Sequence, residues 1–92
     1  MKFNNTQLKV TAIMPTYNRI LLLKECVAML LKQTVPLQEI IIINNNSIDG
    51  TKEYLNELQE KENKISVLNE SKNLGSSGGF AKGIEEVKKR DN

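Results

Sequence analysis

The feature that most constrains the fold is a run of four isoleucines (residues 40–43) that leads directly into three asparagines (residues 44–46). An all-apolar segment of this length is typical of a parallel strand that is buried on both faces of a sheet. In open α/β sheets, ligands bind at the carboxyl ends of the strands. A row of amides there can read the hydrogen-bonding edge of a base or a sugar. The alternative is a polar turn that caps the following helix.

Composition places this strand in one small globular domain. The chain has 92 residues, of which 39% are apolar. Its 13 basic and 11 acidic residues give a net charge of +2 and are interspersed, which argues against nucleic acid as a partner. The absence of histidine excludes His-based metal sites and Ser-His-Asp triads. The single cysteine, Cys26, excludes an internal disulfide, and its apolar helical surroundings favour a buried structural thiol.

No segment of the sequence predicts a membrane span or a secretion signal. Apolar runs fall short of the ~20 residues that a transmembrane helix needs, and the start of the chain lacks the apolar core of a signal peptide. The sequence therefore predicts a cytoplasmic protein. Residues 1–7 are expected to form a flexible N-terminus and residues 8–92 a single domain.

Three strands are predicted to alternate with three helices. The strands are expected at residues 8–14, 39–43 and 65–68, and the helices at residues 19–33, 51–63 and 80–90. This alternation with short connections predicts an α/β fold, in which a parallel sheet is built with right-handed crossovers. The expected strand order is 3-2-1, as in doubly wound folds.

Helix caps and apolar faces can also be predicted. Asn18 is expected to cap the first helix, and Ser47 or Asp49 the second. Pro15 is expected to end the first strand, because proline cannot donate to the ladder. The apolar residues at helical spacing are Leu23, Val27, Leu30 and Leu31 in the first helix, Tyr54, Leu55 and Leu58 in the second, and Phe80, Ile84 and Val87 in the third.

All three strand-to-helix loops must lie at one edge of the sheet. They are predicted at residues 15–18, 44–50 and 69–79, the parts of the chain richest in Asn, Ser and Gly. Glycines before a helix let backbone N–H groups approach a phosphate. However, Phe80 stands where a P-loop needs lysine, and no glycine follows the first strand as a dinucleotide fingerprint requires. The alternative is that the glycines serve only a turn and helix packing.

The first loop offers an aromatic ring and a guanidinium group. A base can stack on the ring of Tyr17, and Arg19 can pair with phosphate oxygens. The alternative is a helix start that carries a surface arginine. The three loops together predict a nucleotide-type ligand at this edge.

Three motifs resemble, in order, those of family-2 glycosyltransferases. They are Pro-Thr-Tyr-Asn-Arg (residues 15–19), Asn-Asn-Asn-Ser-Ile-Asp-Gly-Thr (residues 44–51) and Asn-Leu-Gly-Ser-Ser-Gly-Gly-Phe (residues 73–80). The last motif is most similar to the branch of galactofuranosyl- and rhamnosyl-transferases. The resemblance implies the N-terminal βαβαβα half of a three-layer, Rossmann-like GT-A domain. It also implies inverting transfer of a sugar from a nucleotide-sugar donor, of UDP or dTDP type, to a glycan or lipid-linked acceptor.

The resemblance further implies a set of site residues. The nucleotide-binding residues would be Pro15, Thr16, Tyr17, Arg19, Asn44, Asn45, Asn73, Gly78 and Gly79, with Lys82 as a phosphate contact. Family members usually carry an acidic residue where Asn44 stands. An amide can accept from a base N3–H and donate to a carbonyl, whereas a carboxylate can only accept. We therefore expect Asn44 to make a two-point contact to a uracil or thymine base.

The remaining catalytic parts are expected outside this chain. In the family, the metal-binding aspartates follow the next strand, and the general base lies further downstream. Residues 8–92 are therefore expected to be a donor-nucleotide half-site that is truncated before the metal-binding motif. No catalytic residue and no turnover are expected from it alone. The full-length enzyme would need a divalent metal, Mg or Mn, and would be cytoplasmic or peripheral at the inner face of the membrane.

Other readings of the chain stay open. A half-domain would leave the edge of the strand at residues 8–14 bare, which predicts self-association through that edge. The chain could also be a non-catalytic nucleotide- or sugar-binding module, or a small α/β interaction domain.

Overall fold

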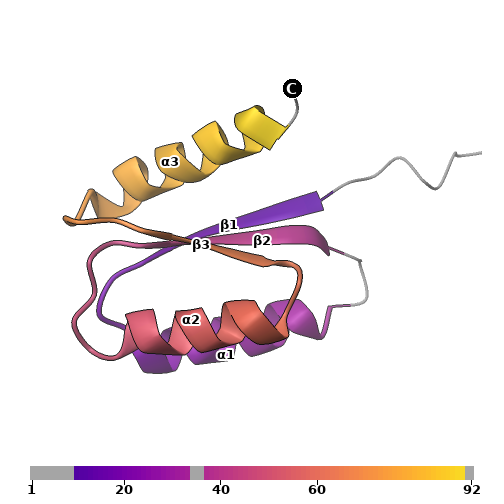
Figure 1. The fold of residues 1–92 in the computed structure, drawn as a ribbon, viewed down its shortest axis with the longest axis horizontal. Coiled ribbons are helices and arrows are strands. Elements are labelled where there is room, and N and C mark those ends of the chain that lie inside the picture. Colours follow the sequence, from indigo (N-terminus) through magenta and orange to yellow (C-terminus); the bar gives the residue numbers. More distant parts are fainter. Residues whose placement is uncertain (1–9, 34–36, 91–92) are drawn as a thin grey trace, which may run out of the picture.

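The computed structural model describes residues 10–33 and 37–90 (Figure 1). The elements are β1 (Val10–Thr16), α1 (Ile20–Leu31), β2 (Leu37–Asn44), α2 (Thr51–Lys61), β3 (Ile65–Asn69) and α3 (Gly75–Arg90). The predicted alternation of strands and helices is confirmed. The predicted flexible N-terminus at residues 1–7 lies outside the described residues, as do the first residues of the predicted first strand.

The isoleucine run forms half of the central strand of the sheet, β2. The sheet is parallel, and its order β1-β2-β3 is the predicted 3-2-1 order seen from the other edge. Residues 40–43 pair with residues 12–15 of β1 on one side and with residues 65–68 of β3 on the other. All four isoleucines are 0% exposed. A strand that is paired at both edges and covered on both faces requires apolar side chains on both, which explains the run.

Helices cover both faces of the sheet, which gives the expected three layers. α1 and α2 lie on one face and α3 lies on the other (Figure 1). The main apolar cluster is under α1 and α2, where Leu23, Val27 and Leu55 pack against Ile40 and Ile42. This layer positions the start of both helices beside the carboxyl ends of the strands.

β1 continues through Pro15 to Thr16, so the prediction that Pro15 ends the strand is wrong. β1 is an edge strand, and its last residue faces β2, because the N–H of Asn45 donates to the carbonyl of Thr16. Alternation then points the backbone groups of Pro15 away from the sheet, where a missing N–H costs no ladder bond.

α3 begins at Gly75, earlier than the predicted start at Phe80. The glycine-rich stretch therefore belongs mainly to the helix rather than to a loop. A Cβ on Gly79 would lie 2.9 Å from Cβ of Pro15, and one on Gly83 would overlap the side chain of Ile13. These glycines let the helix approach β1 closely, which is the packing alternative that the sequence left open.

The predicted apolar faces of two helices are partly wrong. Phe80 and Ile84 of α3 are 47% and 40% exposed, because the small residues of this helix, and not the large ones, face the sheet. In α1, Leu31 is 40% exposed, whereas Leu23 and Val27 are buried as predicted. In the part of the chain that the structure describes, no helix is both long and apolar enough to cross a bilayer.

Asn18 does not cap α1, contrary to the prediction. The N-cap residue is Arg19, and it makes no side-chain cap hydrogen bond. The backbone N–H of Ile20 donates instead to Oδ2 of Asp49, at 3.0 Å. Asn18 turns to the neighbouring loop, where its Oδ1 accepts the N–H of Ile48 at 2.7 Å.

Candidate functional site

A cleft of about 350 Å³ opens beside the carboxyl end of β1. We call it the first cavity. Six of the residues that the sequence predicted for a nucleotide site line it: Pro15, Thr16, Tyr17, Arg19, Asn45 and Asn73. They come from the end of β1 and from the three loops at residues 17–19, 45–50 and 70–74. The volume is in the range of small-molecule sites.

The other side of the first cavity is formed by helices. Leu22 and Cys26 of α1 provide an apolar wall, and Gly75 and Ser76 provide the first turn of α3. The sequence analysis did not predict any of these four residues as lining. Leu22 and Cys26 stand at i and i+4 on α1, but nothing in the sequence shows that this flank lies toward β1. Cys26 is half-buried at the cavity, not fully buried in the core.

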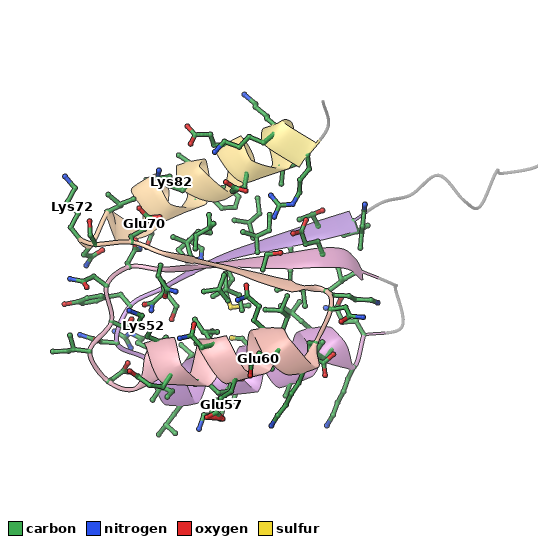
Figure 2. The ribbon with its side chains drawn as sticks, in the orientation of Figure 1. Lys52, Glu57, Glu60, Glu70, Lys72 and Lys82 are labelled. Atoms are coloured by element: carbon green, nitrogen blue, oxygen red, sulfur yellow. The ribbon has the colours of Figure 1, made fainter. Side chains whose placement is uncertain are left out.

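Three predicted site residues are not part of either cavity. Gly79 is buried against Pro15, and Gly78 packs close to Leu74. Lys82 lies further along α3 (Figure 2) and is absent from the lining of both clefts. The first turn of α3, at Gly75, is the part of the glycine-rich stretch that reaches the first cavity.

Asn44 faces a second cavity of about 260 Å³ at the ends of β2 and β3. The lining of this second cavity is polar and comprises Asn44, Asn46, Ser47, Lys52, Asn69, Glu70 and Ser71. Figure 2 shows Lys52 and Glu70 at this end of the molecule. The two clefts therefore flank the end of the central strand.

The side chain of Asn44 is engaged within the protein. Its Nδ2 donates to Oδ1 of Asn69 at 2.9 Å, and its Oδ1 accepts the N–H of Ser47 at 3.0 Å. Only 2% of Asn44 is exposed. An amide has a second N–H and a second lone pair, so a contact from Asn44 to a base stays a prediction.

Asn45 fixes the loop that follows β3. Its Nδ2 donates to the carbonyl of Gly75 at 3.2 Å, and its Oδ1 accepts the N–H of Leu74 at 3.4 Å. Asn73 adds a further hydrogen bond, because its Oδ1 accepts the N–H of Gly75 at 2.8 Å. Asn45 thus joins the loops that surround the first cavity, in addition to lining it.

Tyr17 and Arg19 are the groups most available to a ligand. Tyr17 is 46% exposed and Arg19 is exposed, and both line the first cavity. Among residues 10–33 and 37–90, neither side chain has a hydrogen-bond or ion-pair partner. A ring and a guanidinium in this state can stack on a base and pair with a phosphate.

Asp49 accepts hydrogen bonds at the starts of two helices. The sequence predicted it as one of two candidate caps of the second helix. The hydroxyl of Thr51 donates to it and is the main reason that the pKa of Asp49 lies below its ordinary value. Loss of solvent around the carboxylate opposes this shift, and the backbone N–H groups of Ile20 and Thr51 lower the pKa further. Ser47, the other predicted cap of α2, does not contact that helix start and bonds to Asn18 instead.

The described residues do not supply a metal site. Among residues 10–33 and 37–90, no group of three His, Cys, Asp or Glu side chains is placed to hold a metal ion. The polar side chains at the two cavities are mostly amides, hydroxyls and cations, with Glu70 as the one carboxylate in their lining, and a single carboxylate suits a polar organic ligand better than a divalent metal.

A parallel sheet with helices on both faces and a cleft at its carboxyl edge defines a Rossmann-like α/β binding unit. The profile of "Glycosyl transferase family 2" matches residues 11–90, and the chain belongs to this family.

Two similar proteins are themselves described as glycosyltransferases. The chain is 32% identical over 73 residues to a poly(ribitol-phosphate) beta-glucosyltransferase of Bacillus spizizenii, covering 77% of this chain and 12% of the relative. It is 32% identical over 80 residues to a GalNAc(5)-diNAcBac-PP-undecaprenol beta-1,3-glucosyltransferase of Campylobacter jejuni, covering 86% of this chain and 26% of the relative. The chain thus spans about a quarter or less of the length of these relatives.

A solved structure shares the fold. The mannosyltransferase PcManGT from Pyrobaculum calidifontis, in complex with GDP-Man and Mn²⁺, superposes with a TM-score of 0.75 at 23% identity. The match covers 87% of this chain and 25% of that protein. The expected GT-A α/β arrangement is thereby confirmed. The resemblance to the galactofuranosyl- and rhamnosyl-transferase branch stays a prediction.

Proposed function

We propose that the first cavity binds the nucleotide of a nucleoside diphosphate sugar. The observation that carries the proposal is a convergence in one cleft: the first loop brings an exposed ring and an arginine that has no partner among the described residues, and the other two loops bring one amide each. The Tyr17 ring suits a base, Arg19 suits the diphosphate, and Asn45 and Asn73 suit the hydroxyls of a sugar. Pro15 and Thr16 would form the floor of the site.

The remaining predicted contacts are proposed around this cleft. Asn44 would reach the base from the side of the second cavity through its free N–H and lone pair. Gly78 and Gly79 would act by holding the start of α3 close to the ligand, since both are packed against other parts of the chain. Lys82, on the next turn of α3, would contribute positive potential toward the phosphates.

We propose that the unit serves as the donor-nucleotide half-site of an inverting transferase. Membership of the family supports sugar transfer to a glycan or lipid-linked acceptor as the reaction of the whole protein. A divalent metal, Mg or Mn, would assist that reaction, and the complex of PcManGT with Mn²⁺ supports this part of the proposal. Since the described residues offer no metal ligands, the metal-binding and catalytic side chains would come from outside them.

The location of the whole protein is proposed on the same basis. We expect it on the cytoplasmic side, where it would be peripheral to the inner face of the membrane when its acceptor is lipid-linked. The undecaprenol acceptor in the name of the Campylobacter jejuni relative supports a membrane-bound acceptor.

Calorimetric titration with uridine and thymidine diphosphates tests the binding proposal. We expect binding of at least one nucleotide, with an affinity that Mn²⁺ leaves unchanged, because the described residues lack metal ligands. Arg19→Ala and Tyr17→Ala should each weaken binding about tenfold, the equivalent of ~1.4 kcal/mol. Lys61→Ala, at the end of α2, is the control that should bind normally.

Cys26 allows a second measurement of the same site. It is the only cysteine in the chain, and its thiol borders the first cavity. A bound nucleotide should slow alkylation of Cys26, whereas adenosine at the same concentration, which lacks a diphosphate, should protect less. Alkylation at an unchanged rate with a saturating nucleotide would place the ligand elsewhere.

A second candidate function rests on the open edge of β1. Among the residues that the structure describes, β1 has a neighbouring strand on one side only, and residues Val10–Thr16 carry no charged side chain that would protect the edge. Since Thr16 faces β2, Thr11 and Ile13 present their backbone N–H and carbonyl groups outward. We propose that two copies can pair antiparallel through these groups, as an interaction domain would.

A further inference from the structure

The loop after β1 and the loop after β2 are joined by three hydrogen bonds. The N–H of Asn18 donates to Oγ of Ser47 at 2.9 Å, and Oδ1 of Asn18 accepts the N–H of Ile48 at 2.7 Å. The N–H of Ile20 donates to Oδ2 of Asp49 at 3.0 Å. We call this set of contacts the loop latch. It connects segments that are about 30 residues apart in the chain.

Asp49 is the member of the loop latch that joins two helices. Its Oδ2 accepts from the first turn of α1, and its Oδ1 accepts the N–H of Thr51 at 3.2 Å together with the Thr51 hydroxyl. The first N–H groups of a helix lack partners within the helix. Neither N-cap residue, Arg19 or Gly50, supplies one from its side chain. One carboxylate therefore serves the starts of both α1 and α2.

The loop latch holds the backbone between the two ligand-facing side chains of the first cavity. Asn18 lies between Tyr17 and Arg19 and has a φ of 49°, in the left-handed region that few residues other than glycine adopt. Two hydrogen bonds to residues 47 and 48 keep it there. The side chains of Tyr17 and Arg19 have no hydrogen-bond or ion-pair partner among the described residues, so the hydrogen bonds that hold these residues in place act on the backbone.

From these contacts we propose that Asp49 is a positioning residue for the first cavity, which holds Tyr17 and Arg19 in place without touching the ligand. The proposal rests on the proposed function of the first cavity. Asp49 itself is outside the lining of that cavity. It acts on the ligand through the backbone of residues 17–20, by fixing the first turn of α1 against the loop after β2.

Nucleotide affinity of Asp49→Ala is the first test. We expect the variant to bind uridine diphosphate about tenfold more weakly. A tenfold change in affinity corresponds to ~1.4 kcal/mol, and the loss of an acceptor at a helix start has a cost of the same order. Gln59→Ala is a matched control, because Gln59 also accepts a backbone N–H, that of Val67 at 2.8 Å, and lies outside both cavities. The control should lose stability and retain affinity. Equal affinities of Asp49→Ala and wild type would overturn the proposal.

A double-mutant cycle separates positioning from general loss of stability. The change Asp49→Ala is made in the wild type and in a variant that carries both Tyr17→Ala and Arg19→Ala. If Asp49 acts through these two side chains, its removal should weaken binding about tenfold in the first background and hardly at all in the second. A factor that is the same in both backgrounds would show that Asp49 does not act through them.

Amide hydrogen exchange keeps the proposal testable if no nucleotide binds. In Asp49→Ala, the acceptors of the Asn18 and Ile48 N–H groups are still present. These amides should nevertheless exchange faster than in Gln59→Ala, because the loops separate when the third contact is lost. Unchanged exchange would overturn the loop latch whether or not the wild type binds nucleotide. Faster exchange in a protein that binds no nucleotide would support the loop latch and refute only the proposed ligand.

Discussion

Gly83 of α3 lies directly over Ile13 of β1, with no space for a methyl group between them. A second glycine, Gly79, makes the same kind of approach one turn earlier, at Pro15. Gly75 and Ser76 form the first turn of the same helix. The packing of α3 on β1 therefore also brings them to the edge of the first cavity. The close approach of α3 to β1 is thus a structural condition for the site.

Gly83→Ala should destabilise the fold by about 1–3 kcal/mol, the cost of overpacking a well-filled contact. The added Cβ would overlap the side chain of Ile13, which is held between α3 and the sheet. Urea denaturation followed by circular dichroism measures the effect. Glu85→Ala, an exposed position on the same helix, is the control that should change little. A Gly83→Ala protein as stable as the wild type would mean that α3 packs less closely than described.

Asn44→Ala should lower both stability and nucleotide affinity. It leaves the side-chain Oδ1 of Asn69 and the N–H of Ser47 without their partner, at a cost of about 1–3 kcal/mol. If Asn44 also contacts a base, binding of uridine or thymidine diphosphate should weaken markedly. Asn69→Ala is the control, because it removes the partner of the Asn44 amide and keeps the amide itself. Calorimetry that finds the same dissociation constant for Asn44→Ala and wild type would refute base recognition by this residue.

Most of the fold follows from patterns that local physics controls. The isoleucine run predicts a central parallel strand, and residues 40–43 are fully buried. The alternation of strands and helices then predicts a parallel sheet, and the analogy with doubly wound folds supplies its order. Helix faces are harder to predict, because a stripe of large residues and a stripe of glycines can both face a sheet. In α3 the glycines do so, and Phe80 is left half-exposed.

The site was predictable as far as the loops define it. Tyr17, Arg19, Asn45 and Asn73 line the first cavity as expected, since the carboxyl ends of parallel strands must meet. The wall formed by α1 at Cys26 could not be predicted, because it depends on which flank of the helix lies over the sheet edge. The local pattern predicts the bond from the Thr51 N–H to Asp49, because Asp49 is a candidate cap of the second helix. The bond from the Ile20 N–H to Asp49 is invisible to local patterns, since it joins distant segments.

The contribution of Asp49 to stability should depend on pH. Its pKa in the folded protein is lowered from an ordinary value of 3.8, chiefly by the hydrogen bond from Thr51. Folding therefore favours the ionised form, and the stabilisation is present above the unfolded-state pKa and is lost as the pH falls through the folded-state pKa. The gap in unfolding free energy between wild type and Asp49→Asn should shrink from about pH 6 to about pH 2. A gap that widens in acid would contradict this assignment.

Association through β1 should depend on one flank of α1. Leu22 and Cys26 line the first cavity beside β1, and Met29, 70% exposed, continues the same flank one turn further along the helix. We consider two copies of the chain whose β1 strands pair antiparallel about a two-fold axis at Ile13. In such a pair, this flank of α1 would face the same flank of the other copy. Met29→Lys would then place two positive charges close together. Sedimentation velocity should show association of the wild type at high concentration and its loss in Met29→Lys. Leu21→Lys, a 76% exposed position outside this flank, should associate like the wild type. A wild type that stays monomeric throughout would refute pairing through β1, and equal loss in both variants would indicate non-specific apolar contact.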